Sequence, residues 1–183
     1  IDFVVVCDLD GLNTEIDENA VATCWSRDDW DVVTANQRGP YYDIFALRHP
    51  AWCPVDCLEQ YEFLQRFRNN KHRNQYSSIH ALMISIPKDA DWIPVDSAFG
   101  GLAIYRKEIL RGRTYRGIDM DGHEICEHVT LHSDIRTANG KIFINPALLN
   151  AGYTEHTETL KPISRLQKNL KNFLKKPIQT LIT

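Results

Sequence analysis

The chain has 183 residues, 43% of them hydrophobic, which is enough for one domain with a substantial core. Its formal net charge of -3 and pI near 6.2 give no general case for a nucleic-acid partner. No apolar run approaches the ~18 residues of a membrane span. We therefore expect a cytoplasmic protein.

The average charge hides an asymmetry along the chain. Residues 161–183 carry six basic side chains and no acidic one, which leaves 15 basic against 24 acidic residues in the rest. Four apolar residues recur at helical spacing between the lysines: Leu166, Leu170, Phe173 and Leu174. We expect a core at 1–160 and a basic amphipathic helix at 161–183, which would contact an anionic membrane surface peripherally or dock on the acidic body.

Cysteine usage favours a reduced compartment, because the five cysteines are odd in number and contain no C-x-x-C pair. Cys53 and Cys57 could still pair in a loop. The chain begins at Ile1, almost directly in a predicted core strand. We interpret it as the N-terminally truncated, later part of a longer protein.

The most chemically informative stretch is the apolar run at residues 3–6 followed by Asp8 and Asp10. Four β-forming residues without a polar break are typical of a strand buried on both faces in a largely parallel sheet. The aspartates would lie at its carboxyl end, where Gly11 permits a turn. Period-2 geometry directs both aspartates to one side, and two oxygen donors on one side suit Mg²⁺ or Mn²⁺. Solvated aspartates at a strand end are the alternative.

Periodicity and turn residues predict the elements that follow the aspartates. Spacing of apolar residues predicts a helix over 15–25, a strand over 31–35 and an extended segment over 41–48. Asp43 and Arg48 frame that last segment, where they would either fix a polar ligand or form a structural ion pair.

Asp56 is a plausible N-cap for a helix over 57–68. The polar run 69–75 predicts a mobile solvated loop, with a lid over a phosphate as the alternative. Residues 80–86 are apolar but fit a helix or a strand equally.

Residues 92–106 predict two short extended runs flanking Gly100 and Gly101, whose pairing permits close backbone approach to a ligand or simply a hairpin. A loop at 112–122, a helix at 124–136 and a strand at 141–144 that breaks at Asn145 and Pro146 should follow.

The predicted helix at 124–136 contains a near miss for a zinc-protease motif. His123 and His128 are five positions apart, so on a helix their imidazoles differ by about 140° in direction and cannot share one zinc. His128 and His132 have the i, i+4 spacing that would let two histidines on a helix bind one zinc. Helical histidines, however, more often occupy ordinary polar positions.

Taken in order, the segments resemble GT-A nucleotide-sugar glycosyltransferases of the surface-polysaccharide, capsule-associated mannosyltransferase-like type. The resemblance spans residues 4–156, and it is carried by five segments: the D-x-D strand at 4–13, the Tyr-Tyr-Asp-x-x-Ala-Leu-Arg segment at 41–48, the Ser-Ala-Phe-Gly-Gly-x-Ala-Ile-Tyr-Arg segment at 97–106, Cys-Glu-His at 126–128 and Ile-Asn-Pro at 144–146. It implies an α/β fold with a mixed, largely parallel sheet flanked by helices, GT-A-like and Rossmann-related. The implied activity is metal-dependent hexosyl transfer from a UDP- or GDP-linked donor to a glycan or lipid-linked acceptor, in surface polysaccharide synthesis.

The resemblance also implies residue roles. Asp10 would ligate Mn²⁺ or Mg²⁺, and Asp8 would contact the donor ribose or a metal-bound water. His156 would complete the metal shell, with His128 and His132 as rivals. Gly100 and Gly101 would line the donor-sugar and acceptor side, and Asp43, Arg48, Asp96 and Ser97 would contact substrate.

Glu127 matches the acidic position at a helix start. It would deprotonate the acceptor hydroxyl in an inverting enzyme, or bind a sugar in a retaining one. A merely favourable charge in the first turn of a helix is the structural alternative.

The sequence is also compatible with two other functions. The haloacid dehalogenase superfamily places D-x-D-G-T after an apolar strand, but Leu12 replaces the threonine and the later lysine and acidic-pair motifs are missing. Such a Mg²⁺-dependent phosphatase would use Asp8 as its nucleophile. A degenerate, non-catalytic glycan-binding domain is the other alternative, because the βα units that bind the nucleotide base in GT-A enzymes would precede Ile1.

Overall fold

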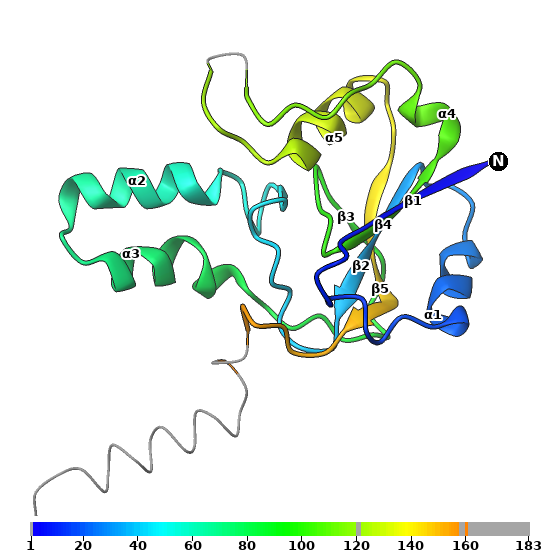
Figure 1. Cartoon of the computed structure of the whole chain (residues 1–183), viewed down its shortest axis with the longest axis horizontal. Helices are drawn as coiled ribbons and strands as arrows, with labels where there is room; N and C mark the ends of the chain where they lie inside the picture. Colours follow the sequence, from blue (N-terminus) through cyan, green and yellow to red (C-terminus); the bar gives the residue numbers. More distant parts are fainter. Residues whose placement is uncertain (1, 120–121, 158–159, 161–183) are drawn as a thin grey trace, which may run out of the picture.

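The computed structural model describes residues 2–119, 122–157 and 160. The predicted helix at 161–183 lies outside the described residues. The described part has an α/β architecture built around one mixed five-stranded sheet in the order β1-β4-β2-β5-β3 (Figure 1). Its strands are β1 (Phe3–Cys7), β2 (Val32–Gln37), β3 (Ile93–Pro94), β4 (Leu102–Arg106) and β5 (Ile142–Ala151).

The α/β class predicted from the sequence is confirmed, but the largely parallel sheet is not. Among the described strands, only β2 and β5 pair in parallel, whereas β1 with β4, β2 with β4, and β3 with β5 are antiparallel. An apolar run alone does not fix strand direction, because central antiparallel strands covered on both faces have the same composition.

Two hydrophobic clusters cover the two faces of the sheet. Along β2, Val32 belongs to the cluster that contains Leu131 and Ile135 of the helix α5 (Glu127–Thr137), while Val33 belongs to the cluster that contacts α1 (Glu18–Ala22). This alternation follows the period of two along a strand. Figure 1 shows α1 and α5 well apart on the molecule, with the sheet between them.

The strand before the aspartates is an edge strand, which corrects the prediction that it is buried on both faces. β1 pairs only with β4 among the described strands, and 58% of Val5 is exposed. β2 is the strand whose six residues are all buried. β-Branched composition is therefore not sufficient to distinguish an edge strand from a central one.

The remaining helices lie outside the sheet. They are α2 (Cys57–Phe67), α3 (Lys71–Ser78) and α4 (Lys107–Leu110), with short 3₁₀ turns η1 (Thr23–Trp25) and η2 (His80–Leu82). α2 and α3 run side by side as a hairpin that extends away from the sheet (Figure 1). As predicted, Asp56 caps α2 by accepting hydrogen bonds from the backbone N–H groups of Leu58 and Glu59.

Three local predictions are wrong. The run 69–75 is largely helical, because Asn70 caps α3 through the N–H of Arg73 and Asn74 is buried. The segment 41–48 contains a tight turn at 44–46, in which the Asp43 carboxylate accepts from the N–H of Ala46. β5 continues past Asn145 and Pro146. The pairing register with β2 shifts there, and proline is tolerated because a residue in such a bulge does not need to donate a backbone hydrogen bond.

All five cysteines are free thiols, Cys53 and Cys57 included. Among the helices of the described ranges, none is long and apolar enough to cross a membrane.

Candidate functional site

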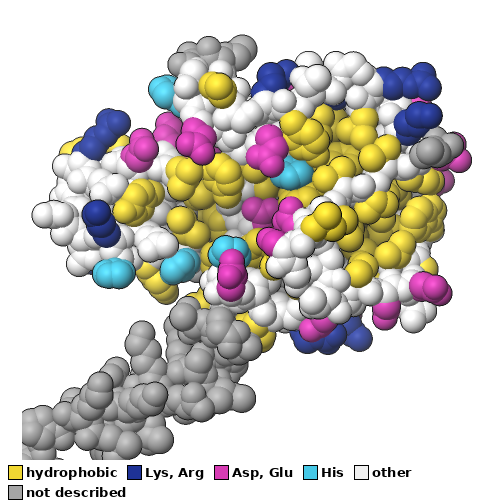
Figure 2. Space-filling model, in the orientation of Figure 1, with side chains coloured by type: hydrophobic (Ala, Val, Ile, Leu, Met, Phe, Trp, Pro, Cys, Tyr) yellow, Lys and Arg dark blue, Asp and Glu magenta, His cyan; other side chains and the backbone are white. Residues whose placement is uncertain are grey.

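The aspartates of the D-x-D stretch open onto a cavity of about 270 Å³. It lies where β1 ends and α5 begins, and we call it the acidic pocket. Its lining is Asp8, Asp10, Leu12, Tyr42, Asp43, Phe45, Ala46, Phe99, Cys126, Glu127, His128 and His156. Figure 2 shows acidic and histidine side chains gathered around a hollow at the centre of the face between the α2–α3 hairpin and the sheet.

The backbone of the paired glycines brings the aspartates of separate segments together. The N–H of Asp8 donates to the carbonyl of Gly101 at 3.0 Å, and the N–H of Gly100 donates to the Asp43 carboxylate at 2.9 Å. Both glycines have positive φ, and a Cβ on Gly101 would lie 2.9 Å from the Tyr42 hydroxyl and 3.6 Å from Asp8 Oδ2. Glycine is therefore required where this turn passes the carboxylates.

Three side-chain amides hold that turn in place, and the sequence reasoning did not identify them. Asn13 Nδ2 donates to the carbonyls of Asp8 and Gly101 at 2.8 and 3.0 Å. Asn150 Nδ2 donates to Asn13 Oδ1 and to the carbonyl of Gly100, both at 2.8 Å, and Gln37 Nε2 donates to the same Gly100 carbonyl at 2.9 Å. Gln37 and Asn150 are fully buried. For Gln37 and Asn150, the available signal in the sequence was an amide residue near the end of a strand.

Burial and neighbouring negative charges raise the pKa of two carboxylates in the pocket, those of Asp8 and Asp43. Burial, followed by the charges of Asp10, Asp43 and Glu127, raises the pKa of Asp8 to about 6. Burial also raises the pKa of Asp43, although its bonds from the N–H groups of Gly100 and Ala46 act in the opposite direction. No lysine or arginine belongs to the described lining of the acidic pocket. The pocket therefore has an excess of negative charge that a cation would relieve.

Glu127 and His128 occupy the first turn of α5, at the edge of the pocket. The Glu127 side chain is 51% exposed. The His128 ring stacks on Phe99 with centroids 3.7 Å apart, and Tyr115 meets it edge-on. Burial lowers the pKa of His128 to about 4, and its Nδ1 is buried without a hydrogen-bond partner. Glu127 is thus the accessible group of the two.

His156 comes from the segment after β5 and lines the pocket. Its ring stacks on Tyr42, with centroids 5.4 Å apart and an interplanar angle of 15°. Its side chain is about half exposed. Among the three candidate histidines, His156 and His128 line the pocket and His132 does not.

The other predicted contacts have structural partners elsewhere. Arg48 pairs with Asp56 and donates to the carbonyl oxygens of Phe45 and Leu47 at 3.0 and 2.7 Å. Asp96 pairs with Arg136 at 2.8 Å.

Ser97 and His132 form a buried group in the core. The Ser97 hydroxyl lies 2.9 Å from His132 Nδ1, and the Tyr105 hydroxyl lies 3.0 Å from His132 Nε2. Burial lowers the pKa of His132 to about 3. None of Arg48, Asp96, Ser97 and His132 lines the acidic pocket.

A second cavity, of about 450 Å³, adjoins the first beneath the α2–α3 hairpin. We call it the hairpin groove. Its lining is Tyr42, Asp43, Ile44, Phe45, Cys57, Leu58, Gln75, Ile79, His80, Met83, Glu124 and His156. Tyr42, Asp43, Phe45 and His156 line both cavities.

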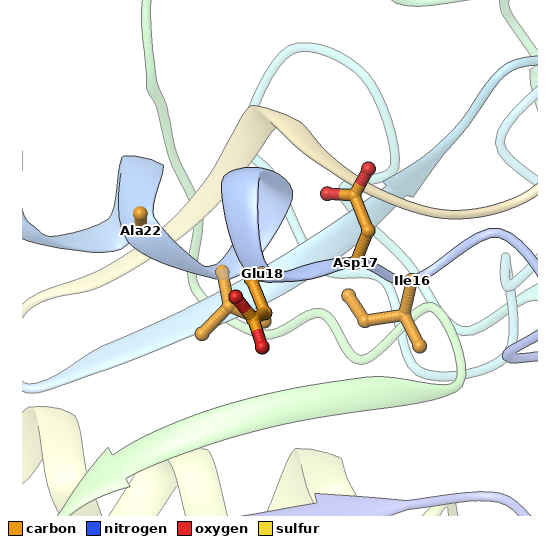
Figure 3. A pocket seen from close by; sticks show the side chains of 5 residues that line it. Ile16, Asp17, Glu18 and Ala22 are labelled. Atoms are coloured by element: carbon orange, nitrogen blue, oxygen red, sulfur yellow. The ribbon is translucent and has the colours of Figure 1, made fainter.

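A third hollow lies on the opposite side of the molecule, at α1. Figure 3 shows that its labelled side chains, from Ile16 to Ala22, all come from one short segment, and that the carboxylates of Asp17 and Glu18 point in different directions. Asp17 is engaged as the helix cap, at 2.7 Å from the N–H of Ala20. These groups do not converge on a common ligand.

No protein-family model matches the chain, and no curated protein or solved structure is significantly similar to it. Its function must therefore be inferred from the chemistry of the acidic pocket.

Proposed function

We propose that the chain is the catalytic part of a metal-dependent glycosyltransferase that moves a hexose from a nucleotide-sugar donor to a hydroxyl acceptor. The observation that carries this proposal is the acidic pocket itself. Four carboxylates, those of Asp8, Asp10, Asp43 and Glu127, line one cavity at the end of the D-x-D strand, with His156 beside them. Such a site suits a cation that accompanies an anionic diphosphate better than it suits an anion alone.

The donor set fits Mn²⁺ or Mg²⁺ in its chemistry. The evidence for the fit is the grouping of carboxylates around Asp8, whose pKa is raised by burial and then by these neighbouring charges, together with the absence of lysine and arginine from the described lining. Asp10, Asp8 and His156 would hold the ion, which would offset charge on the leaving diphosphate. Within the described residues, however, no three His, Cys, Asp or Glu side chains are yet arranged to hold a metal. Oxygens of the diphosphate would complete the shell.

Glu127 is the residue best placed to act on the acceptor. It is exposed at the pocket edge, in the first turn of α5. In an inverting reaction its carboxylate accepts the proton of the acceptor hydroxyl as that oxygen bonds to the sugar. In a retaining reaction it binds the acceptor or donor sugar instead.

The phosphatase alternative receives less support from the pocket. No lysine or arginine of the described residues lines the cavity to neutralise the charge of a phosphate monoester.

The test is an activity assay on a panel of UDP- and GDP-hexoses, with release of nucleoside diphosphate as the readout. We expect release that requires Mn²⁺ or Mg²⁺ and stops with EDTA. Asp10→Ala should lower the rate at least about 100-fold because the ion loses a ligand. Asp91→Ala changes an exposed aspartate outside the pocket and should leave the rate unchanged.

Four other results would contradict the proposal. Metal-independent release, or equal rates in the Asp10→Ala and Asp91→Ala variants, would remove the role of the pocket. Release of inorganic phosphate from phosphomonoesters, lost in Asp8→Asn, would favour the phosphatase. No release with any donor, together with metal-indifferent glycan binding, would favour a non-catalytic binding domain.

A further inference from the structure

The hairpin groove is not accounted for by the donor, whose diphosphate and metal belong in the acidic pocket. It has a volume within the usual range of about 300–1,000 Å³ for small-molecule sites. It shares four lining residues with the acidic pocket: Tyr42, Asp43, Phe45 and His156. A molecule held in the groove could therefore extend a hydroxyl group into the acidic pocket, where Glu127 would act on it.

The walls of the groove are largely apolar. Five apolar side chains from three segments line it: Ile44, Phe45, Leu58, Ile79 and Met83. Leu58 is 38% exposed although it faces a cavity, so a bound apolar group would remove this surface from water. Burial of that kind is worth about 25 cal/mol per Å². The stacked rings of Tyr42 and His156 add a flat aromatic surface at the boundary.

The negative charge of the groove excludes anionic ligands. Asp43 and Glu124 line it, and the described lining of the groove and of the acidic pocket contains no lysine or arginine. A phosphate or uronate in the acceptor would therefore meet carboxylates without a paired cation, which is unfavourable at short range. The donor differs, because a divalent ion accompanies its diphosphate.

We propose that the hairpin groove binds the acceptor, and that the acceptor is an uncharged glycoside with an apolar aglycone. The inference rests on the proposed function, since it places the sugar hydroxyl of the acceptor at Glu127 and the aglycone between α2 and the 79–83 segment. It excludes acceptors that carry phosphate or a uronic acid next to the reacting sugar.

Binding of simple glycosides tests the inference without donor or metal. The probes are phenyl glycosides of glucose, galactose and mannose, compared with their methyl glycosides and with phenyl glucuronide. Titration calorimetry at pH 8 avoids the range in which imidazole ordinarily gains charge. We expect at least one phenyl glycoside to bind at least about tenfold more tightly than its methyl counterpart and than phenyl glucuronide.

Variants of α2 locate the site. Leu58→Gln should weaken phenyl glycoside binding several-fold, while Phe67→Gln, at a 76% exposed position of the same helix outside the groove, should not. Leu58→Arg should raise glucuronide affinity by supplying the missing cation. Equal binding of phenyl and methyl glycosides, insensitivity to Leu58, or preference of the wild type for glucuronide would each overturn the inference.

The result is separable from the test of the proposed function. Metal-dependent donor cleavage without phenyl glycoside binding refutes only the groove assignment. Phenyl glycoside binding that depends on Leu58, without donor cleavage, supports the groove as a neutral glycan site and refutes the transferase.

Discussion

His128 and His132 lie one helical turn apart on α5 and illustrate how neighbouring residues acquire different roles. Their spacing made both candidates for metal binding, but their surroundings differ. His132 lies between two hydroxyl groups in the core, whereas His128 reaches the acidic pocket. The sequence could indicate that these positions face inward, yet it could not identify partners that come from Ser97 and Tyr105, distant along the chain.

We predict that His132→Leu destabilises the fold by about 1–3 kcal/mol at pH 7.5, because the buried hydroxyl groups of Ser97 and Tyr105 each lose one hydrogen bond. Urea denaturation followed by circular dichroism measures this loss. His72→Leu, an exposed substitution on α3, is the control and should change stability by less than about 0.5 kcal/mol. A neutral result for His132→Leu would contradict its structural role.

The same histidines predict a pH dependence. Burial lowers the pKa of His132 to about 3 and of His128 to about 4, against about 6.5 in an unfolded chain. Between these values the unfolded state binds more protons, so the wild type should lose stability as the pH falls from about 6.5 towards 3.

His132→Leu removes one of these two contributions. Its stability should therefore fall less steeply in that window, by up to about 1.4 kcal/mol per pH unit. Asp8 acts in the opposite direction between about pH 4 and 6, but it is present in both proteins and cancels in the comparison. Parallel curves for the two proteins would refute the assignment of His132 as a neutral core residue.

The glycines at the pocket can be tested by a matched pair. Gly100 and Gly112 both have positive φ, but a Cβ on Gly100 would lie 2.8 Å from the carbonyl oxygen of Ala35, while nothing lies within 4 Å at Gly112. Gly112→Ala should cost about 1 kcal/mol for its conformation alone. Gly100→Ala should cost about 1–3 kcal/mol more, since a backbone atom must move. Equal losses in thermal denaturation would mean that the turn is less tightly packed than described.

At the scale of helices and strands, the sequence correctly predicted features that depend on side chains only a few residues apart. The N-cap at Asp56 and the end of α5 near Asn139, whose φ of 61° is left-handed, follow from side-chain chemistry. α3 was missed because its composition is polar, and its tie to the end of α2 is a hydrogen bond from the buried Asn74 to the carbonyl of Arg68. The turn at 44–46 was missed because its apolar residues also fit a strand.

The start of α2 provides a prediction at this scale. Asp56 both caps the helix and pairs with Arg48, whose side chain is largely buried. Asp56→Asn keeps the cap and loses the charge, whereas Asp56→Ala loses both. Denaturation should show both variants less stable than the wild type, with Ala below Asn by about 1 kcal/mol. Full stability of Asp56→Asn would instead leave Arg48 available for a ligand.

At the scale of the whole molecule, the sequence predicted the α/β class but not the sheet order. Strand pairing depends on contacts between distant segments, such as the antiparallel contact of β1 with β4 that brings Gly101 to Asp8. The order in turn decides which predicted residues meet. Asp8, Asp10, Asp43, Glu127 and His156 share a pocket, while Arg48, Asp96 and Ser97 have partners elsewhere.

The acidic pocket as a cation site is the central claim, and uptake of Mn²⁺ followed by the electron paramagnetic resonance signal of the free ion tests it most directly. We predict that the wild type and Asp91→Ala bind Mn²⁺ equally, that GDP or UDP tightens this binding, and that Asp10→Ala weakens it at least about tenfold while remaining folded by circular dichroism. No uptake by the wild type, or undiminished uptake by Asp10→Ala, would contradict the account.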